Sequence, residues 1–285
     1  MGKLRHAVSE IHQNFFSLKW WRNRVFVPHV VGRATRLHPS YPGYDEAIKV
    51  TEEDWDNLLV LDACRADAFE RVADLDRFDD YRSVVSLGSH SSEWTRRNFA
   101  GQEFGDIVYV SANPHTSKLA GDSFHTLVEM WDREFDDISG TVPPDTMGEA
   151  AREALDQYPN KRLIVHFMQP HGPFIGSDVP EEEFIERYWE AYDQNLEFAL
   201  ASVYELLDEL PGRTVVSADH GQIAPGPVTS LFGVNGHKAR LRHPGVVTVP
   251  WAIKDGDRRR IVTGKTSETT SDGIDNRLRD LGYKI

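Results

Sequence analysis

The sequence predicts an α/β fold in which a mostly parallel central sheet is covered by helices on both faces. Short apolar runs, each about as long as a buried strand, recur along the chain and alternate with helical patterns. The chain has 285 residues, 40% of them hydrophobic, which is enough for the core of one large domain.

Five apolar runs are the expected strands. They span residues 58–61, 107–110, 162–168, 214–218 and 246–249, and the last run ends at Pro250. Continuous apolar runs, without alternating polar residues, are typical of parallel strands that are buried on both faces. We therefore expect these runs to lie inside the sheet.

Two segments have the spacing of amphipathic helices. Between Tyr188 and Leu210, apolar residues recur three, four and seven positions apart, and Pro211-Gly212 ends the pattern. Residues 146–158 form a second candidate. The tail, from about residue 255 to 285, is polar, and we expect at most a small terminal helix there.

Residues 1–50 are expected to form an appendage of helix and loop, and residues 51–285 the α/β domain. The appendage contains a basic segment rich in aromatic and apolar side chains, namely Phe15, Phe16, Leu18, Trp20, Trp21, Val25 and Phe26. We favour packing of residues 15–26 on the chain's own domain. Peripheral contact with a membrane surface and contact with a partner stay open as alternatives.

Composition excludes several classes of function. The formal charge is −13, so the protein should repel nucleic acid unless it has a local basic patch. With Cys64 as its single cysteine, the chain cannot form an internal disulfide. It has no apolar run typical of a signal peptide or a transmembrane helix. We therefore expect a cytoplasmic protein, and oligomeric state stays open.

Aspartate and histidine residues, which can bind metal ions, lie at or just after the ends of several apolar runs. In open α/β sheets, ligands bind at the carboxyl ends of the strands. Asp62 follows the first run, His166 and His171 lie at or after the third, and Asp219-His220 follow the fourth. A single aspartate there is usually a turn or helix cap, but three strands that deliver carboxylates and imidazoles to one edge predict a metal site.

Residues 217–221, Ser-Ala-Asp-His-Gly, are the most specific of these motifs. Adjacent aspartate and histidine can bind one ion if the chain turns tightly, which the glycine allows. Aspartate with histidine suits zinc or manganese, whereas a mainly oxygen ligand set suits calcium or magnesium. The sequence leaves the divalent ion open among these four.

Three blocks in the order found here resemble the sulfatase-like branch of the alkaline phosphatase superfamily. They are residues 57–62 followed by Arg65, residues 166–174, and residues 218–221, and the resemblance spans about residues 55 to 251. It implies an alkaline phosphatase-like fold and hydrolysis or transfer of phosphate or sulfate esters.

The resemblance also implies roles for particular residues. Asp62, Asp219 and His220 would bind the metal, and His171 would contact the transferred group. His237 and Lys238 are similar to a later basic position of the family that binds substrate or a second metal. Arg65 either binds substrate oxygens or pairs with Asp67. His166 is expected in the core or behind the metal ligands.

The nucleophile is expected between residues 89 and 95, where the family has a Thr, Ser or modified Cys at a helix N-terminus. Ser91-Ser92-Glu93-Trp94 matches the family's Thr-Pro-Glu-Ser frame best, so Ser91 is our first choice, both as nucleophile and as a further metal ligand. Thr95 is the second choice, and Ser89 and Ser92 stay open. A helix cap is the alternative role for these residues.

The expected activity is that of a metal-dependent hydrolase acting on phosphate or sulfate esters. No Cys or Ser is followed by x-Pro-x-Arg, so a formylglycine sulfatase is excluded. Two alternatives are a transferase that passes a phospho-alcohol group to a glycan or lipid, and an inactive relative that binds an anionic glycan. The substrate is expected to be an anionic ester, free or linked to a glycan or lipid.

Overall fold

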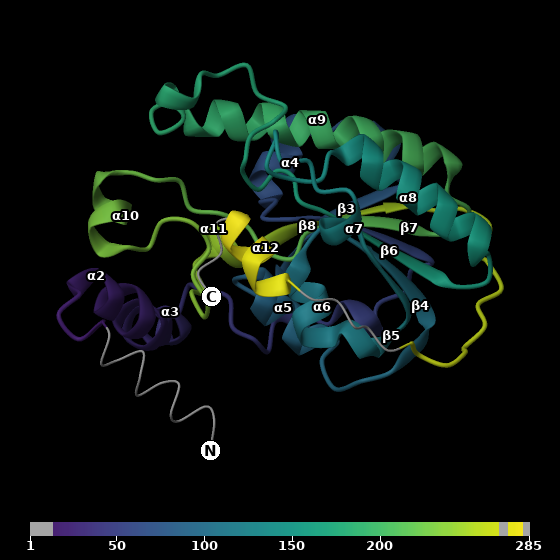
Figure 1. Cartoon of the computed structure of the whole chain (residues 1–285), viewed down its shortest axis with the longest axis horizontal. Coiled ribbons are helices and arrows are strands. Elements are labelled where there is room, and N and C mark those ends of the chain that lie inside the picture. Colours follow the sequence, from purple (N-terminus) through teal and green to yellow (C-terminus); the bar gives the residue numbers. More distant parts are fainter. Residues whose placement is uncertain (1–13, 268–272, 282–285) are drawn as a thin grey trace.

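A computed structural model describes residues 14–267 and 273–281. Eight strands form one sheet in the order β1-β3-β8-β7-β2-β6-β4-β5 (Figure 1). Strand β8 runs antiparallel to β3 and β7, and every other pair is parallel. The predicted α/β fold with a mostly parallel sheet is therefore confirmed.

The strands are β1 (Ala47–Ile48), β2 (Asn57–Leu61), β3 (Asp80–Ser86), β4 (Phe104–Ser111), β5 (Phe124–Glu129), β6 (Arg162–Phe167), β7 (Thr214–Ser217) and β8 (Thr248–Lys254). The helices are α2 (Leu18–Trp21), α3 (Gly32–Leu37), α4 (Ala66–Val72), α5 (Ser91–Asn98), α6 (Pro114–Ala120), α7 (Met130–Arg133), α8 (Pro144–Gln157), α9 (Tyr188–Glu209), α10 (Pro227–Phe232), α11 (Pro244–Val247) and α12 (Ile274–Asp280). A π-helical stretch, Arg22–Val31, joins α2 to α3, and single 3₁₀ turns span Val50–Glu52, Leu75–Arg77, Gly121–Ser123 and Glu181–Glu183.

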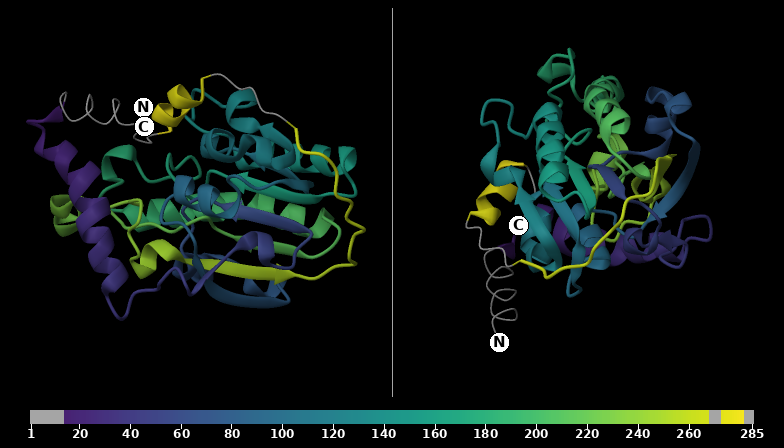
Figure 2. Two further views of the ribbon diagram at one scale, coloured as in Figure 1. Left: turned by 90° about the horizontal axis from the view of Figure 1, so that it is seen from below. Right: turned by 90° about the vertical axis from the view of Figure 1, so that its right-hand side faces the viewer.

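Helices cover both faces of the sheet. Helices α4, α8 and α9 pack together on one face, and α5 and α6 cover the other, with α12 against α6 (Figures 1 and 2). The central strand β2 is buried along its whole length between β6 and β7. Since these three strands are parallel, their carboxyl ends meet at one edge, where the site lies.

The last strand lies further along the chain than the sequence predicted. Residues 244–247 form the short helix α11, and β8 begins at Thr248 and continues past Pro250 to Lys254. Pro244, at the start of α11, favours a helical turn because its fixed φ suits the first helical position. Strands β3 and β5 had no counterpart among the expected strands, because half-exposed residues interrupt their apolar pattern.

The N-terminal helical segment, which we define as residues 18–37, is continuous from α2 to α3. Its inner face includes the buried residues Val27 and Thr35, and the Thr35 hydroxyl accepts a hydrogen bond from the Arg242 backbone amide. Within the described residues, no helix has both the length and the apolar composition that crossing a bilayer requires. The boundary at residue 50 between appendage and domain stays a prediction.

Candidate active site

Asp62 lies at the turn that ends β2. The next residue, Ala63, has a left-handed backbone with φ of 62°, which is uncommon outside glycine and reverses the chain sharply. The Ala63 amide donates to Asp219 Oδ1 at 3.1 Å, and its carbonyl accepts from the Tyr192 hydroxyl at 2.7 Å. These bonds hold the strained turn, and with it the Asp62 carboxylate, against the end of β7.

Asp219 and His220 follow β7 in a tight turn. The His220 amide donates to Asp219 Oδ1, and the imidazole Nδ1 lies 2.9 Å from the Gly221 carbonyl. A side chain at Gly221 would come within 2.4 Å of the Gly245 carbonyl, so the glycine is required by close backbone packing. Because Nδ1 donates to that carbonyl, the neutral ring presents Nε2 as an acceptor.

Asp62, Asp219 and His220 form a buried group that could hold a metal ion. One ligand atom of each lies within 4.8 Å of the other two. Among the described residues, Asp219 Oδ2 and His166 Nε2 are buried there without a hydrogen-bond partner, 3.9 Å apart. A buried carboxylate oxygen without a partner is costly. A divalent cation would supply that partner, and the donor set fits one.

His166 lies behind this group in strand β6, as one of the two sequence alternatives predicted. It is fully buried, its Nδ1 lies 2.9 Å from the Tyr109 hydroxyl, and its Nε2 lies 3.8 Å from Asp62 Oδ2. Burial lowers the pKa of His166 to about 4, so the ring is neutral at physiological pH.

Ser91 is the first residue of α5, and its hydroxyl lies in the same group. Ser91 Oγ is 3.1 Å from His220 Nε2 and 3.3 Å from Asp62 Oδ2. The ends of β2 and β7 and the start of α5 therefore bring together all four residues that we expected to bind metal.

The other candidate hydroxyls have different surroundings. Ser89 Oγ donates to the Glu93 carboxylate, and Ser92 Oγ lies 3.0 Å from His90 Nδ1. Thr95, one turn further along α5, is buried, and its hydroxyl has no hydrogen-bond partner in the part of the chain that the structure describes. Of these four hydroxyls, that of Ser91 lies within hydrogen-bond distance of both Asp62 and His220.

Asn113 is a site residue that the sequence analysis missed. Its amide donates to Asp62 Oδ2 at 2.7 Å, while its Oδ1 accepts from the His115 amide and caps α6. Asn113 lies two residues after β4, so the rule that ligands gather at strand ends could have identified it. It fixes the orientation of the Asp62 carboxylate.

Besides His166, five imidazoles lie at the site. The His237 ring centroid lies 4.5 Å from that of His220, 5.0 Å from that of His171 and 5.1 Å from that of His90, and His115 packs on His90 at 5.3 Å. The rings belong to the segments that follow β3, β4, β6 and β7.

The tautomers of these rings follow from their hydrogen bonds. His171 Nδ1 lies 2.6 Å from the Gly172 carbonyl and His237 Nδ1 lies 2.8 Å from Gln222 Oε1, so each neutral ring offers Nε2 as an acceptor. His90 is the reverse, because its Nδ1 accepts from the Ser92 amide and its proton is on Nε2.

Burial lowers the pKa of His171 to about 4 and that of His237 well below its usual value. Burial is also the main reason that the pKa of His90 is lowered. Neighbouring charges, among them that of Lys238, lower the pKa of His90 and of His237 further. Neutral rings cannot offset negative charge as cations. They can accept a proton or bind a cation, and the charge of Lys238 acts on His90 and His237.

Arg65 lies outside this group. Its guanidinium pairs with Asp67 at 2.5 Å, donates to the Gln222 carbonyl at 3.0 Å and stacks 4.9 Å from the Trp189 ring. Arg65 therefore joins the start of α4 to the loop that carries His237. Binding of substrate oxygens by Arg65 stays a prediction.

Glu93 joins three segments around Ser91. Its Oε2 accepts from the Ser89 amide and hydroxyl and from the Arg240 amide, at 2.9 to 3.2 Å. Its Oε1 accepts from the Tyr44 hydroxyl at 2.6 Å and from Arg97 Nε at 3.1 Å. Burial alone would raise the pKa of Glu93, but the hydrogen bonds from Tyr44 and Ser89 and the charge of Arg97 outweigh it, so its pKa is lowered.

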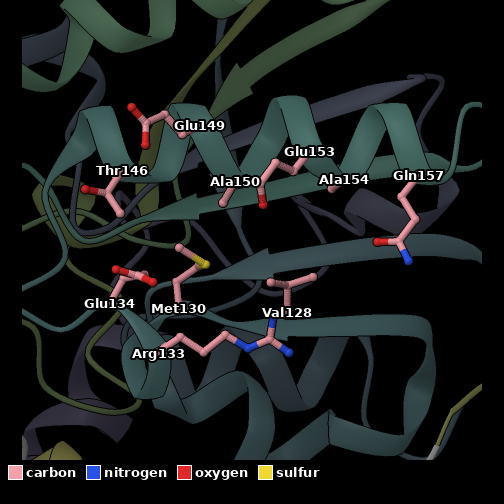
Figure 3. Close-up of a pocket in the computed structure, with 10 residues that line it drawn as sticks. All are labelled: Val128, Met130, Arg133, Glu134, Thr146, Glu149, Ala150, Glu153, Ala154 and Gln157. Atoms are coloured by element: carbon pink, nitrogen blue, oxygen red, sulfur yellow. The ribbon is translucent and has the colours of Figure 1, made fainter.

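A separate groove of about 240 Å³ lies between α8 and the segment from β5 to α7, where side chains of both walls face each other (Figure 3). Glu134, Glu149 and Glu153 line it together with Arg133. None of the residues at the metal-binding group lines this groove, and its acidic walls are unsuited to an anionic ester.

No family model matches the sequence, and no curated protein is similar enough in sequence to match. Solved structures do match. The integral membrane protein lipooligosaccharide phosphoethanolamine transferase A from Neisseria meningitidis is 14% identical with a TM-score of 0.53, over 70% of this chain and 47% of that chain. The present chain thus spans about half of that protein's length.

Two periplasmic domains are also similar. The C-terminal periplasmic domain of phosphoethanolamine transferase EptC from Campylobacter jejuni is 15% identical with a TM-score of 0.50, covering 70% of this chain and 78% of that one. The corresponding domain of EcEptC from Escherichia coli, in complex with Zn, is 12% identical with a TM-score of 0.50, covering 71% and 72%. At these identities the likeness shows only that the chain shares the fold of these domains.

Proposed function

We propose that this chain transfers a phosphate ester group through a covalent intermediate on Ser91, with a divalent cation held by Asp62, Asp219 and His220. The position of the Ser91 hydroxyl carries the proposal, because it lies 3.1 Å from His220 Nε2 and 3.3 Å from Asp62 Oδ2 at the start of an eight-residue helix. When bound, the cation would act as a Lewis acid that lowers the pKa of this hydroxyl.

In the first half-reaction, Ser91 Oγ attacks phosphorus in line, and the bond from phosphorus to the leaving oxygen breaks. The proton of Ser91 is taken up at Nε2 of His171 or His237 and is given to the leaving oxygen. His90 donates its Nε2 proton in a hydrogen bond to a non-bridging oxygen, and the charge of Lys238 also stabilises the transition state.

In the second half-reaction, an incoming hydroxyl gives its proton to Nε2 of His171 or His237 and attacks phosphorus. The bond from phosphorus to Ser91 Oγ breaks, and the imidazole passes the proton to Ser91 Oγ. If the incoming group is water, the enzyme is a hydrolase, and if it is an alcohol, a transferase. We favour an alcohol on a lipid or glycan, because structures with this fold include enzymes named as phosphoethanolamine transferases. Sulfate esters are the alternative donor.

Zinc is the first ion to test, because Asp and His ligands suit it and a domain with this fold has been solved with zinc. The same ligands also suit manganese. The cytoplasmic location expected from the sequence stays a prediction, which fractionation of cells producing the full chain would test.

The test is turnover of an aryl phosphodiester with added zinc or manganese, followed by mass spectrometry of the peptide that contains Ser91. We expect the phospho-alcohol mass on Ser91 and loss of turnover in Ser91→Ala. Ser92→Ala and Thr95→Ala are matched controls that should keep turnover. Adding glycerol or ethanolamine should divert product from hydrolysis to transfer if the acceptor is an alcohol.

Retention of full activity in Ser91→Ala would refute the proposed nucleophile. A protein that binds no divalent cation and turns over neither phosphate nor sulfate esters would favour the inactive, glycan-binding alternative.

A further inference from the structure

The N-terminal end of the described chain exposes large apolar side chains. Phe16 is 94% exposed and Leu18 is 86% exposed, and Phe15, Phe26, Val30 and Leu37 are also exposed. Leu231, which is 70% exposed on α10, lies beside them, because Arg22 donates to its carbonyl at 3.1 Å. Exposed apolar groups that gather in this way mark interaction surfaces.

The aromatic side chains hold one another in place. Phe15 contacts Phe16 and Trp21 edge-to-face, with ring centroids 5.3 and 6.4 Å apart, and Trp20 contacts Trp21 at 5.0 Å. Trp21 Nε1 donates to the Phe15 carbonyl at 2.9 Å, which ties the chain before α2 to the helix. Tryptophan and phenylalanine favour the interface between lipid headgroups and hydrocarbon.

The charge of this segment is opposite to that of the rest of the protein. Residues 14–37 contain five Lys or Arg and no Asp or Glu, whereas the whole chain has a formal charge of −13. Lys19 and Arg33 are exposed on this segment. An anionic surface would repel most of the molecule and attract this end, which fixes the direction of approach.

The segment lies against the loop that carries His237. Arg22 donates to the Ser230 and Leu231 carbonyls, and Arg240 Nη1 lies 3.1 Å from His29 Nδ1. In Figures 1 and 2, the purple N-terminal helices lie at the same end of the molecule as α10 and α11. A surface bound here would therefore lie beside the carboxyl edge of the sheet.

We infer that residues 15–37 and Leu231 dock the protein peripherally on an anionic lipid bilayer. Phe15, Phe16 and Leu18 insert among the acyl chains near the headgroups, and the basic side chains bind lipid phosphates. Contact with a second copy of this chain is the alternative that the dimerisation measurement below tests. The docking does not depend on the chemistry at Ser91.

The test is co-sedimentation of the full chain with phosphatidylcholine vesicles, with and without phosphatidylglycerol. We expect binding only to the anionic vesicles, weakened by salt. The Phe16→Ser, Leu18→Ser double variant should bind about tenfold or more weakly, because it loses two side chains that enter the bilayer. Both residues are too exposed to contribute to folding, so the variant should keep the wild-type Tm.

Val262→Ser is the matched control. Val262 is 43% exposed, and its amide donates to the carbonyl of Asn160, two residues before β6 begins, at the amino edge of the sheet. This variant should bind like the wild type. Equal binding to neutral and anionic vesicles, or unchanged binding of the double variant, would overturn the inference. Dimerisation through this surface without vesicle binding would overturn it too.

Discussion

Replacement of Glu93 by glutamine tests how the nucleophile is positioned. Five hydrogen bonds converge on the two carboxylate oxygens, from Tyr44, Arg97, Arg240 and twice from Ser89. Glutamine keeps one acceptor oxygen. Its NH₂ group replaces the other carboxylate oxygen and would face the N–H and O–H groups that donate to that oxygen in the wild type. The variant therefore loses at least the two bonds on Oε1 or the three on Oε2.

Hydrogen bonds to charged groups contribute roughly 1.5 to 3 kcal/mol each, and partial relaxation recovers some of this. We therefore expect Glu93→Gln to lower the free energy of unfolding by about 3 kcal/mol, a large share of the total stability of a typical domain. Because Ser89 precedes the nucleophile and Arg240 follows His237, kcat should fall by about 10- to 100-fold, more than KM changes.

Urea unfolding followed by tryptophan fluorescence measures the stability change, and aryl phosphodiester turnover measures the change in kcat. The matched control is Glu52→Gln, whose carboxylate is 71% exposed and pairs with Lys49. It should change stability by no more than about 0.5 kcal/mol. If Glu93→Gln matched Glu52→Gln in stability and kcat, the reasoning about this carboxylate would be refuted.

Three further predictions concern the buried polar groups. Asp219→Asn should abolish stoichiometric metal binding, measured by elemental analysis, and its Tm should not respond to a chelator, whereas the wild-type Tm should fall. Asn113→Ala should weaken metal affinity about 10- to 100-fold by calorimetry, because the Asp62 carboxylate loses its orienting amide. Arg242→Lys should lower the free energy of unfolding in urea by about 2 to 3 kcal/mol. The fully buried Arg242 guanidinium donates to three backbone carbonyls, which one ammonium group cannot reach together. An unchanged urea midpoint would contradict this prediction.

Much of the fold could be predicted because the spacing of apolar residues along the chain indicates which side chains are buried. The apolar run at 58–61 is the buried strand β2, and the spacing between Tyr188 and Leu210 gave helix α9 to within one residue. The sequence predicted that Asp62, Asp219 and His220 lie close together, because parallel strands have their carboxyl ends at one edge of the sheet. Strand β3 was not predicted because its paired residues on β8 are 163 to 173 positions away in the sequence and its own side chains are largely exposed or half-buried.

The sequence alone determined the order of buried strands and the residue types that end them, since both depend on neighbours along the chain. Only the tertiary structure decided that Ser91, among four nearby hydroxyls, lies against Asp62 and His220. It also decided that Asn113 orients Asp62 and that His90 carries its proton on Nε2. These features depend on side-chain directions across segments distant in sequence, which no local pattern encodes.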